Sequence, residues 1–145
     1  MVINMYTYYI FNIKEEFKDL YGDNPSGLYN ILNNIKNIKY DEANFGITFL
    51  KQLTRKIEKQ HLDNYLFIKM HKEAFYSKKE NIHYYSDGIL NEISNLEVMN
   101  SCIRIITNKK NSIFIKYLER YSTNFFICDF KNTNFYFIDR IKTLV

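Results

Sequence analysis

The clearest pattern of apolar and polar positions lies in residues 6–21, where two kinds of spacing follow one another. Residues 6–11 form an unbroken apolar and aromatic run, which is typical of a strand. The apolar residues then recur at the spacing of a helix: Ile13, Phe17, Leu20 and Tyr21. The pattern predicts a strand followed by a short helix, with Asn12 as the cap between them. Because so short a helix does not persist alone, its apolar stripe is either covered by the sheet or partly left for a partner.

Two further helical patterns follow a turn. Residues 22–27 are the densest cluster of turn-forming residues and contain the only proline. A second helix is predicted from about Pro25 to Asn37, because its apolar residues are spaced by three and four: Leu28, Ile31, Leu32 and Ile35. A third helix is predicted from about Asp41 to Gln60, with four basic residues on its flank: Lys51, Arg55, Lys56 and Lys59.

From residue 64 the chain changes to short apolar bursts separated by polar turn residues. Their aromatic and β-branched content predicts strands at residues 65–70, 82–85, 102–106, 125–130 and 135–141. Residues 89–99 fit a helix or a strand equally well, residues 111–121 fit a helix, and residues 131–134 predict a hairpin turn because Asn tolerates positive φ. The whole pattern predicts a single α+β domain, residues 1–145, with an antiparallel or mixed sheet of about five to six strands packed against three to four helices.

Composition indicates a protein that needs neither disulfide bonds nor a metal. With 145 residues and a mass of 17.6 kDa, the chain is long enough to bury a core. Its two cysteines, Cys102 and Cys128, are far apart and lack zinc-ligand spacing, so both are interpreted as core residues of a reduced protein. No signal peptide and no apolar run of membrane-spanning length are visible, which predicts a soluble cytoplasmic protein.

The net charge of +4 and the pI near 8.9 point only weakly to nucleic acid, because the lysines are scattered among acidic residues along the chain. Aromatic residues make up 17% of the sequence. In the strands they either form stacking platforms for single-stranded nucleic acid, bury the inner face of the sheet, or stand outside it in a protein interface. The sequence alone leaves these three readings open.

Candidate catalytic groups do not form a motif. His61, His71 and His83 are isolated from one another and are interpreted as surface or half-buried histidines. The four glycines are too dispersed to cradle a phosphate. Glu15 and Glu16 point about 100° apart on a helix and cannot act on one atom. No enzymatic activity, metal or cofactor is therefore expected.

Both ends of the chain resemble the family of the sporulation inhibitor of replication, SirA, a small protein of endospore-forming relatives of Bacillus. That family begins with a Tyr-Thr-Tyr strand, followed by Ile-Lys-Glu-Glu-Phe and, four residues later, a tyrosine. Here these are residues 6–8, residues 13–17 and Tyr21. Further matches lie in residues 28–32, 114–118 and 125–132. The middle of the chain matches only in length.

The resemblance implies a binding protein that performs no chemistry. Members attach to the amino-terminal domain of the replication initiator DnaA and keep it from working at the origin when a cell commits to sporulation. The family's interface aromatics on the first helix fall on Phe17 and Tyr21. A third contact on a later helix falls on Phe49, and a polar contact falls near Gly46, where the glycine is a departure that removes a side chain. A monomer that makes no direct contact with nucleic acid is implied.

The residues themselves give this surface a sensible physical form. Phe17 and Tyr21, at i and i+4, present two rings side by side on one helix. Glu16 is expected on the rim of the surface, while Ile13 and Leu20 hold the helix to the sheet. The alternative is a nucleic-acid-binding module that uses the aromatic strands and the lysines of residues 51–59, or another interaction module of unknown target.

Overall fold

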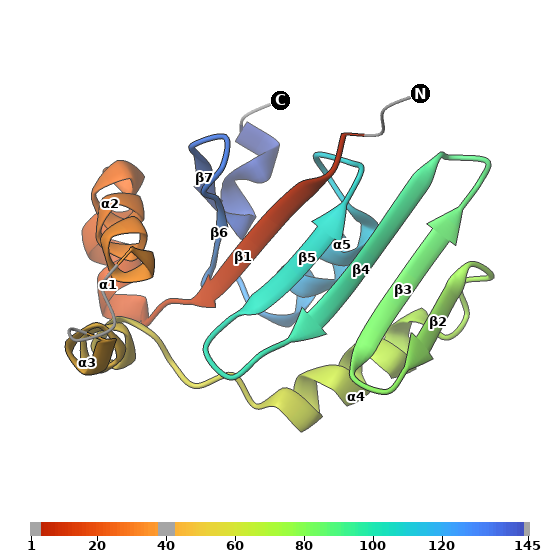
Figure 1. Cartoon of the computed structure of the whole chain (residues 1–145), viewed down its shortest axis with the longest axis horizontal. Helices are drawn as coiled ribbons and strands as arrows, with labels where there is room; N and C mark the ends of the chain where they lie inside the picture. Colours follow the sequence, from red (N-terminus) through yellow and green to blue (C-terminus); the bar gives the residue numbers. More distant parts are fainter. Residues whose placement is uncertain (1–3, 38–42, 144–145) are drawn as a thin grey trace.

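The fold is an α+β arrangement in which an antiparallel sheet is covered by helices (Figure 1). The computed structural model describes residues 4–37 and 43–143. Within these residues it contains five α-helices, seven strands and a final 3-10 helix. In chain order they are β1 (Tyr6–Asn12), α1 (Glu15–Tyr21), α2 (Pro25–Lys36), α3 (Ala43–Leu53), α4 (Lys59–Met70), β2 (Tyr76–Lys79), β3 (Ile82–Asp87), β4 (Glu92–Val98), β5 (Ile103–Thr107), α5 (Ile113–Tyr121), β6 (Phe125–Asp129), β7 (Asn134–Phe137) and η2 (Ile138–Thr143).

The seven strands form one sheet in the order β2-β3-β4-β5-β1-β6-β7. Every neighbouring pair is antiparallel. The amino-terminal strand β1 therefore lies between β5 and β6, with Tyr8 opposite Ile105 and Tyr9 opposite Cys128. The predicted α+β class and antiparallel sheet are confirmed, and the sheet has more strands than expected.

The core lies on both faces of the sheet. On one face, α4 and α5 pack over β1, β4 and β5, and the fully buried Tyr8, Leu66 and Phe114 belong to this cluster. The second cluster lies where α1, α2 and α3 meet β1, β6 and β7, around Phe126 and Leu32. In Figure 1, no described helix covers the near face of β3, β4 and β5. The helices α1 to α3 thus stand at one end of the molecule, outside the main helical layer.

The predicted strand at residues 65–70 is wrong, because this segment is the second half of helix α4. Its buried residues Leu62, Leu66 and Met70 lie at i, i+4 and i+8, whereas Phe67 and Ile68 are exposed. The aromatic and aliphatic burst is therefore a helix with one buried stripe. An alternating strand would instead have buried every second residue.

The predicted third helix is two helices. Helix α3 ends at Leu53, and α4 begins at Lys59. Between them Thr54 forms an isolated antiparallel bridge with Ile13, and the Arg55 N–H donates to the Asn12 carbonyl oxygen at 2.8 Å. Long-range backbone pairing thus interrupts the helical pattern. The predicted start at Asp41 lies outside the described residues.

Four smaller points of the sequence analysis are corrected or resolved by the structure. Asn12 belongs to β1, and the residue at the N-cap position of α1 is Lys14, whose side chain makes no capping hydrogen bond. The ambiguous residues 89–99 contain strand β4. The predicted last strand ends at Phe137 and continues as the 3-10 helix η2. In the turn before it, Thr133 adopts the positive φ that the sequence had suggested for an asparagine.

Candidate partner-binding surface

Helix α1 is fastened to the protein at both ends. At its start, the Lys14 N–H donates to the carbonyl oxygen of Leu53, the last residue of α3, at 2.9 Å. In its second turn, the Lys18 ammonium donates to the Thr123 carbonyl oxygen at 2.7 Å and to the Asp139 carboxylate at 2.8 Å. The side chain of Lys18 is 14% exposed and that of Asp139 is 31% exposed, so this ion pair is partly shielded from water. Tertiary contacts therefore fix the position of a helix too short to be stable by itself.

Phe17 and Tyr21 are half-buried on α1. Both rings pack against the second core cluster. A Cβ placed on Gly27 would lie 3.2 Å from a ring carbon of Tyr21, so this ring rests on the first turn of α2. Each of the two residues is also partly exposed to solvent. The two alternatives that the sequence left open are thus both realised in part, since each ring has a core side and an open side.

The remaining side chains of α1 that bear on the surface are Glu16 and Leu20. Glu16 is exposed, as expected for a rim position. Leu20 is 66% exposed, so the expectation that it holds the helix to the sheet is wrong. Of the two residues expected to hold the helix to the sheet, only Ile13 does so, because it is fully buried. An exposed leucine beside two half-buried rings enlarges the apolar part of the surface.

Helix α3 meets α1 at a common junction. Ile13 pairs with Thr54, immediately after α3, and the hydrogen bond from Lys14 reaches the last residue of α3. Phe17 is the third residue of α1, and Phe49 lies four residues, or about one helical turn, before Leu53 at the end of α3. Phe49 is half-buried against the same core cluster as Phe17 and Tyr21, and Gly46 is buried. The fold thus brings the aromatic candidates from both helices to one end of the molecule.

A basic groove adjoins this junction. It has a volume of about 550 Å³ and is lined by α3, the segment after it, and the β4–β5 turn. Three exposed cations, Lys51, Arg55 and Lys56, border it, together with Asn100 and Ser101. Among the residues that the structure describes, none of the three cations forms a salt bridge. The groove is therefore suited to an anionic partner.

A buried chain of polar side chains lies between α4 and the β2–β3 hairpin. His83 Nδ1 lies 2.8 Å from the Tyr76 hydroxyl, and Nε2 lies 2.8 Å from Asp63 Oδ1. His83 is 0% exposed, so its interpretation as a surface or half-buried residue is wrong. Burial lowers the pKa of His83, although the Asp63 carboxylate acts in the opposite direction. Tyr76 is half-buried and Asp63 is almost fully buried, so this set of hydrogen bonds is best explained as packing between α4 and the hairpin.

Other chemistry finds little support in the described residues. Within residues 4–37 and 43–143, no group of three His, Cys, Asp or Glu side chains is placed to hold a metal ion. Both thiols are buried, and burial raises the pKa of Cys102 to about 11 and that of Cys128 further. None of the described helices combines the length and the apolar character that crossing a bilayer requires.

The fold and the surface together define an α+β protein that carries an aromatic patch where two short helices meet the end of a sheet. Residues 6–142 match the family of the sporulation inhibitor of replication protein SirA. Because the match spans nearly the whole chain, this protein belongs to the SirA family. The match also includes the middle of the chain, where the resemblance in sequence was one of length alone. A comparison with curated proteins finds none that matches.

Proposed function

We propose that this protein is a non-enzymatic inhibitor of replication initiation that acts at the onset of sporulation by binding the amino-terminal domain of DnaA. The family description supports the general role. The observation that carries the proposal is the junction of α1 and α3, where Phe17, Tyr21 and Phe49 are half-buried on one core cluster. Rings held on one side and open on the other are pre-positioned anchors, which lowers the entropy lost when a partner binds.

The surface would work by occupation and not by reaction. Phe17 and Tyr21 supply the anchoring rings, Leu20 adds an exposed apolar contact, and Glu16 lies at the rim, where a charge affects orientation and association rate more than affinity. Gly46 is buried and has no side chain, so on α3 the proposed contact comes from Phe49 and not from this position. Binding of these residues would cover a surface that the initiator uses for its own assembly.

The test is capture of the host's DnaA amino-terminal domain by immobilised protein, followed by measurement of the dissociation constant. Phe17→Ala and Tyr21→Ala are each expected to weaken binding by about 30-fold or more, the usual effect of truncating an anchoring ring. Two matched aromatic truncations lie elsewhere: Phe67→Ala on α4 and Tyr84→Ala on β3, where both rings are exposed. These controls are expected to bind like the wild type.

A second pair of variants separates binding from folding. Phe17 and Tyr21 have a core side, so their truncation also lowers the free energy of unfolding, by about 1–2 kcal/mol for half-buried rings. Leu20→Asn and Glu16→Gln alter exposed side chains and are expected to change the free energy of unfolding by no more than about 0.5 kcal/mol while they weaken capture. Undiminished capture by all four α1 variants would contradict the proposed surface, and absence of capture by the wild type would contradict the proposed partner.

Nucleic-acid binding is the second candidate function, and the basic groove is the observation that favours it. Lys51, Arg55 and Lys56 border the groove without salt-bridge partners among the described residues. The aromatic strand β6 does not contribute, because all of its residues are buried. If the groove binds phosphates, affinity for an oligonucleotide falls steeply with salt and with Lys51→Ala or Arg55→Ala, whereas capture of DnaA through rings does not.

A further inference from the structure

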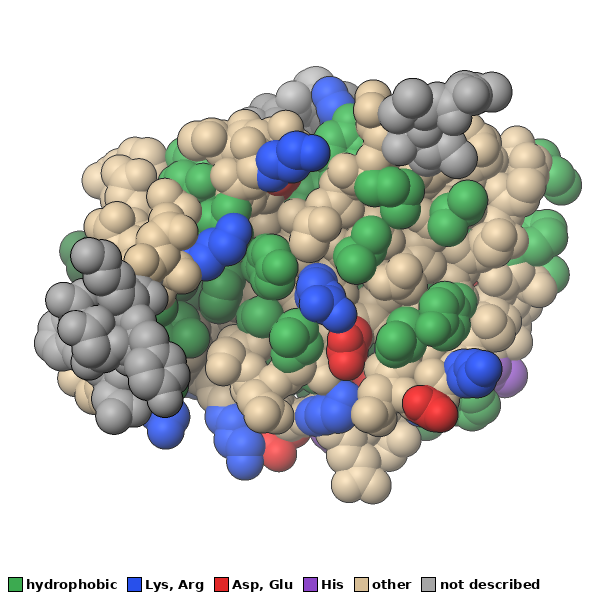
Figure 2. Space-filling view, in the orientation of Figure 1, with side chains coloured by type: hydrophobic (Ala, Val, Ile, Leu, Met, Phe, Trp, Pro, Cys, Tyr) green, Lys and Arg blue, Asp and Glu red, His purple; other side chains and the backbone are tan. Residues whose placement is uncertain are grey.

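A separate apolar pocket lies between the helices at one end of the molecule and the sheet. It has a volume of about 250 Å³ and opens between α2, α3, β1 and the end of β6. Six of its seven lining residues are aliphatic or aromatic: Tyr9, Phe11, Leu32, Ile35, Leu50 and Phe130. In the space-filling view, hydrophobic side chains gather in this region, with a basic side chain among them (Figure 2). The pocket does not include Phe17, Tyr21 or Phe49.

The seventh lining residue, Lys36, places a positive charge at one end of the pocket. Its Nζ lies 4.6 Å from the centre of the Phe130 ring and 5.7 Å from that of Tyr9. Two aromatic faces therefore hold the ammonium group in place. Among the described residues no carboxylate lies within salt-bridge distance of Lys36. The charge is thus oriented but not neutralised by the surrounding chain.

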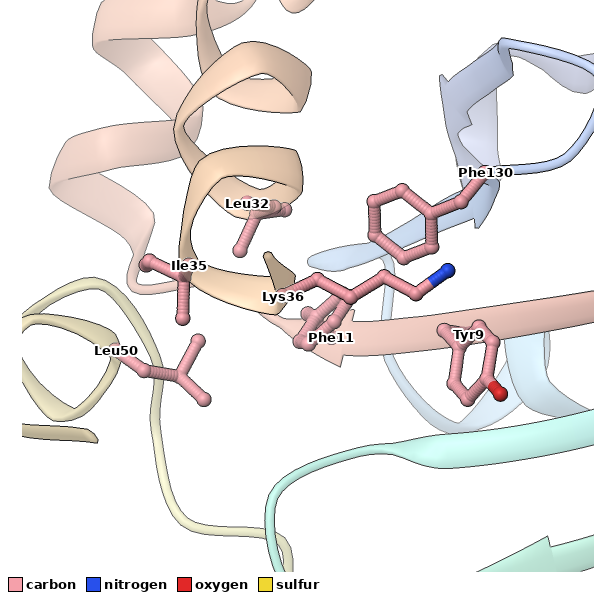
Figure 3. A pocket seen from close by; sticks show the side chains of 7 residues that line it. All are labelled: Tyr9, Phe11, Leu32, Ile35, Lys36, Leu50 and Phe130. Carbon is pink, nitrogen blue, oxygen red and sulfur yellow. The ribbon is translucent and has the colours of Figure 1, made fainter. Parts of the chain in front are cut away.

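The pocket is amphipathic along its length. Figure 3 shows the Lys36 ammonium and the Tyr9 ring at one end, and the aliphatic side chains of Ile35 and Leu50 at the other. A ligand that fills the pocket must accordingly have an apolar body and an anionic end. An apolar alcohol would leave the ammonium unpaired, and an apolar cation would be repelled by it.

We propose that this pocket binds a small amphiphilic carboxylate, with its carboxylate at Lys36 and its apolar chain over Leu32, Ile35 and Leu50. An apolar cavity of about 150 Å³ accommodates benzene. By proportion, the volume here accommodates about ten carbon atoms. A medium-chain fatty acid has this size and this division into a charged head and an apolar chain. The proposal concerns a site distinct from the DnaA-binding surface and does not depend on that function.

The experiment compares three ligands that share a ten-carbon chain: decanoate, decanol and decyltrimethylammonium, each below the concentration at which it aggregates. Binding is followed by methyl NMR of the full-length protein. Decanoate is expected to bind saturably and to shift the methyl signals of Leu32, Ile35 and Leu50. The neutral and cationic compounds are expected to bind at least about fivefold more weakly, since a partly exposed charge-assisted contact is lost.

Three variants locate the site. Lys36→Met keeps the apolar stem but removes the charge, and it is expected to weaken decanoate binding about fivefold while leaving decanol binding unchanged. Lys51→Met removes a charge from an exposed position on α3 outside the pocket and is the matched control. Ile35→Phe adds volume at the aliphatic end and is expected to abolish binding of decanoate. Because Lys36 is exposed, Lys36→Met remains informative even if Ile35→Phe fails to fold.

Four results would overturn the proposal. They are no saturable binding of decanoate, shifts confined to methyl groups outside the pocket, equal weakening by Lys36→Met and Lys51→Met, or decanol binding as tightly as decanoate. The last result would show that Lys36 does not select for a carboxylate. Loss of DnaA capture with intact decanoate binding would leave this inference standing, so the two proposals fail independently.

Discussion

Acidification is expected to destabilise the protein through one residue, His83. An ionised Asp63 carboxylate can accept hydrogen bonds but cannot donate them. His83 Nε2 therefore carries the hydrogen and donates to Asp63, while Nδ1 accepts from the Tyr76 hydroxyl. This is the neutral imidazole. Protonation would place a second hydrogen on Nδ1, force the hydroxyl of Tyr76 to turn, and leave a positive charge in a site with no exposed surface.

The direction and the size of the effect follow from proton linkage. The unfolded chain binds a proton at His83 with a pKa of about 6.5. Burial lowers the pKa of His83 in the folded protein. The contribution of neutral His83 to the free energy of unfolding is therefore complete above about pH 6.5. It is lost as the pH falls below this value, because the unfolded state takes up the proton first. Between the unfolded and folded pKa values, one proton gives a slope of up to about 1.4 kcal/mol per pH unit.

Urea unfolding at pH 7.5, 6.5 and 5.5 measures this slope, and an NMR titration of the imidazole signals measures the pKa of His83 directly. His83→Gln removes the titrating group and is expected to flatten the pH dependence in this range, at a cost in stability at every pH. His61→Gln, at an exposed position, is the matched control and should retain the wild-type slope. A folded pKa of His83 above 6.5, or equal slopes for wild type and His83→Gln, would refute the reasoning.

Two further predictions concern the core. Glu92 Oε2 accepts hydrogen bonds from the hydroxyls of Ser94 and Ser112 and from the Ile113 N–H at the start of α5, at 2.6, 3.1 and 3.0 Å, so Glu92→Ala should lower the free energy of unfolding by about 2–4 kcal/mol. Glu92→Gln, whose amide oxygen still accepts, should cost less, and a larger loss for Gln than for Ala in urea unfolding would contradict this role. Cys102 and Cys128 are both buried, with thiol pKa values raised by burial, so both should resist a thiol reagent at pH 8 in the native protein and react after unfolding. Rapid labelling of the native protein would show that these sites open.

Periodicity predicts those elements in which the spacing of apolar residues alone determines which side chains are buried. Strand β1, helix α2 and helix α5 each show a pattern that matches their one-sided or two-sided burial. The edge strand β2 gave no signal, because its sequence Tyr-Ser-Lys-Lys is mostly exposed and its strand conformation comes from pairing with β3. Helix α4 had a usable signal in Leu62, Leu66 and Met70, which the aromatic burst within it obscured.

The candidate surface was only partly accessible to sequence reasoning. The i, i+4 spacing placed Phe17 and Tyr21 together on one helix, but spacing does not reveal which neighbours cover a ring. That information comes from Gly27 and from the link between Lys14 and Leu53, both of which depend on the folded chain. The exposure of Leu20 was missed for the same reason. The apolar pocket joins β1 to helices and strands far along the sequence, and no local pattern indicates it.

The central place of β1 has a consequence for synthesis on the ribosome. This strand is translated before its two neighbours, β5 and β6, which come from residues 103–107 and 125–129. Helix α1 gains its anchoring salt bridge later still, because the partner of Lys18 is Asp139. In a nascent chain, β1 therefore does not have both of its sheet neighbours until residues 103–129 have been synthesised, and long-range pairing of this kind folds slowly. We expect that a chain terminated before Asp139 lacks this anchor of α1 and does not hold the proposed binding surface in place.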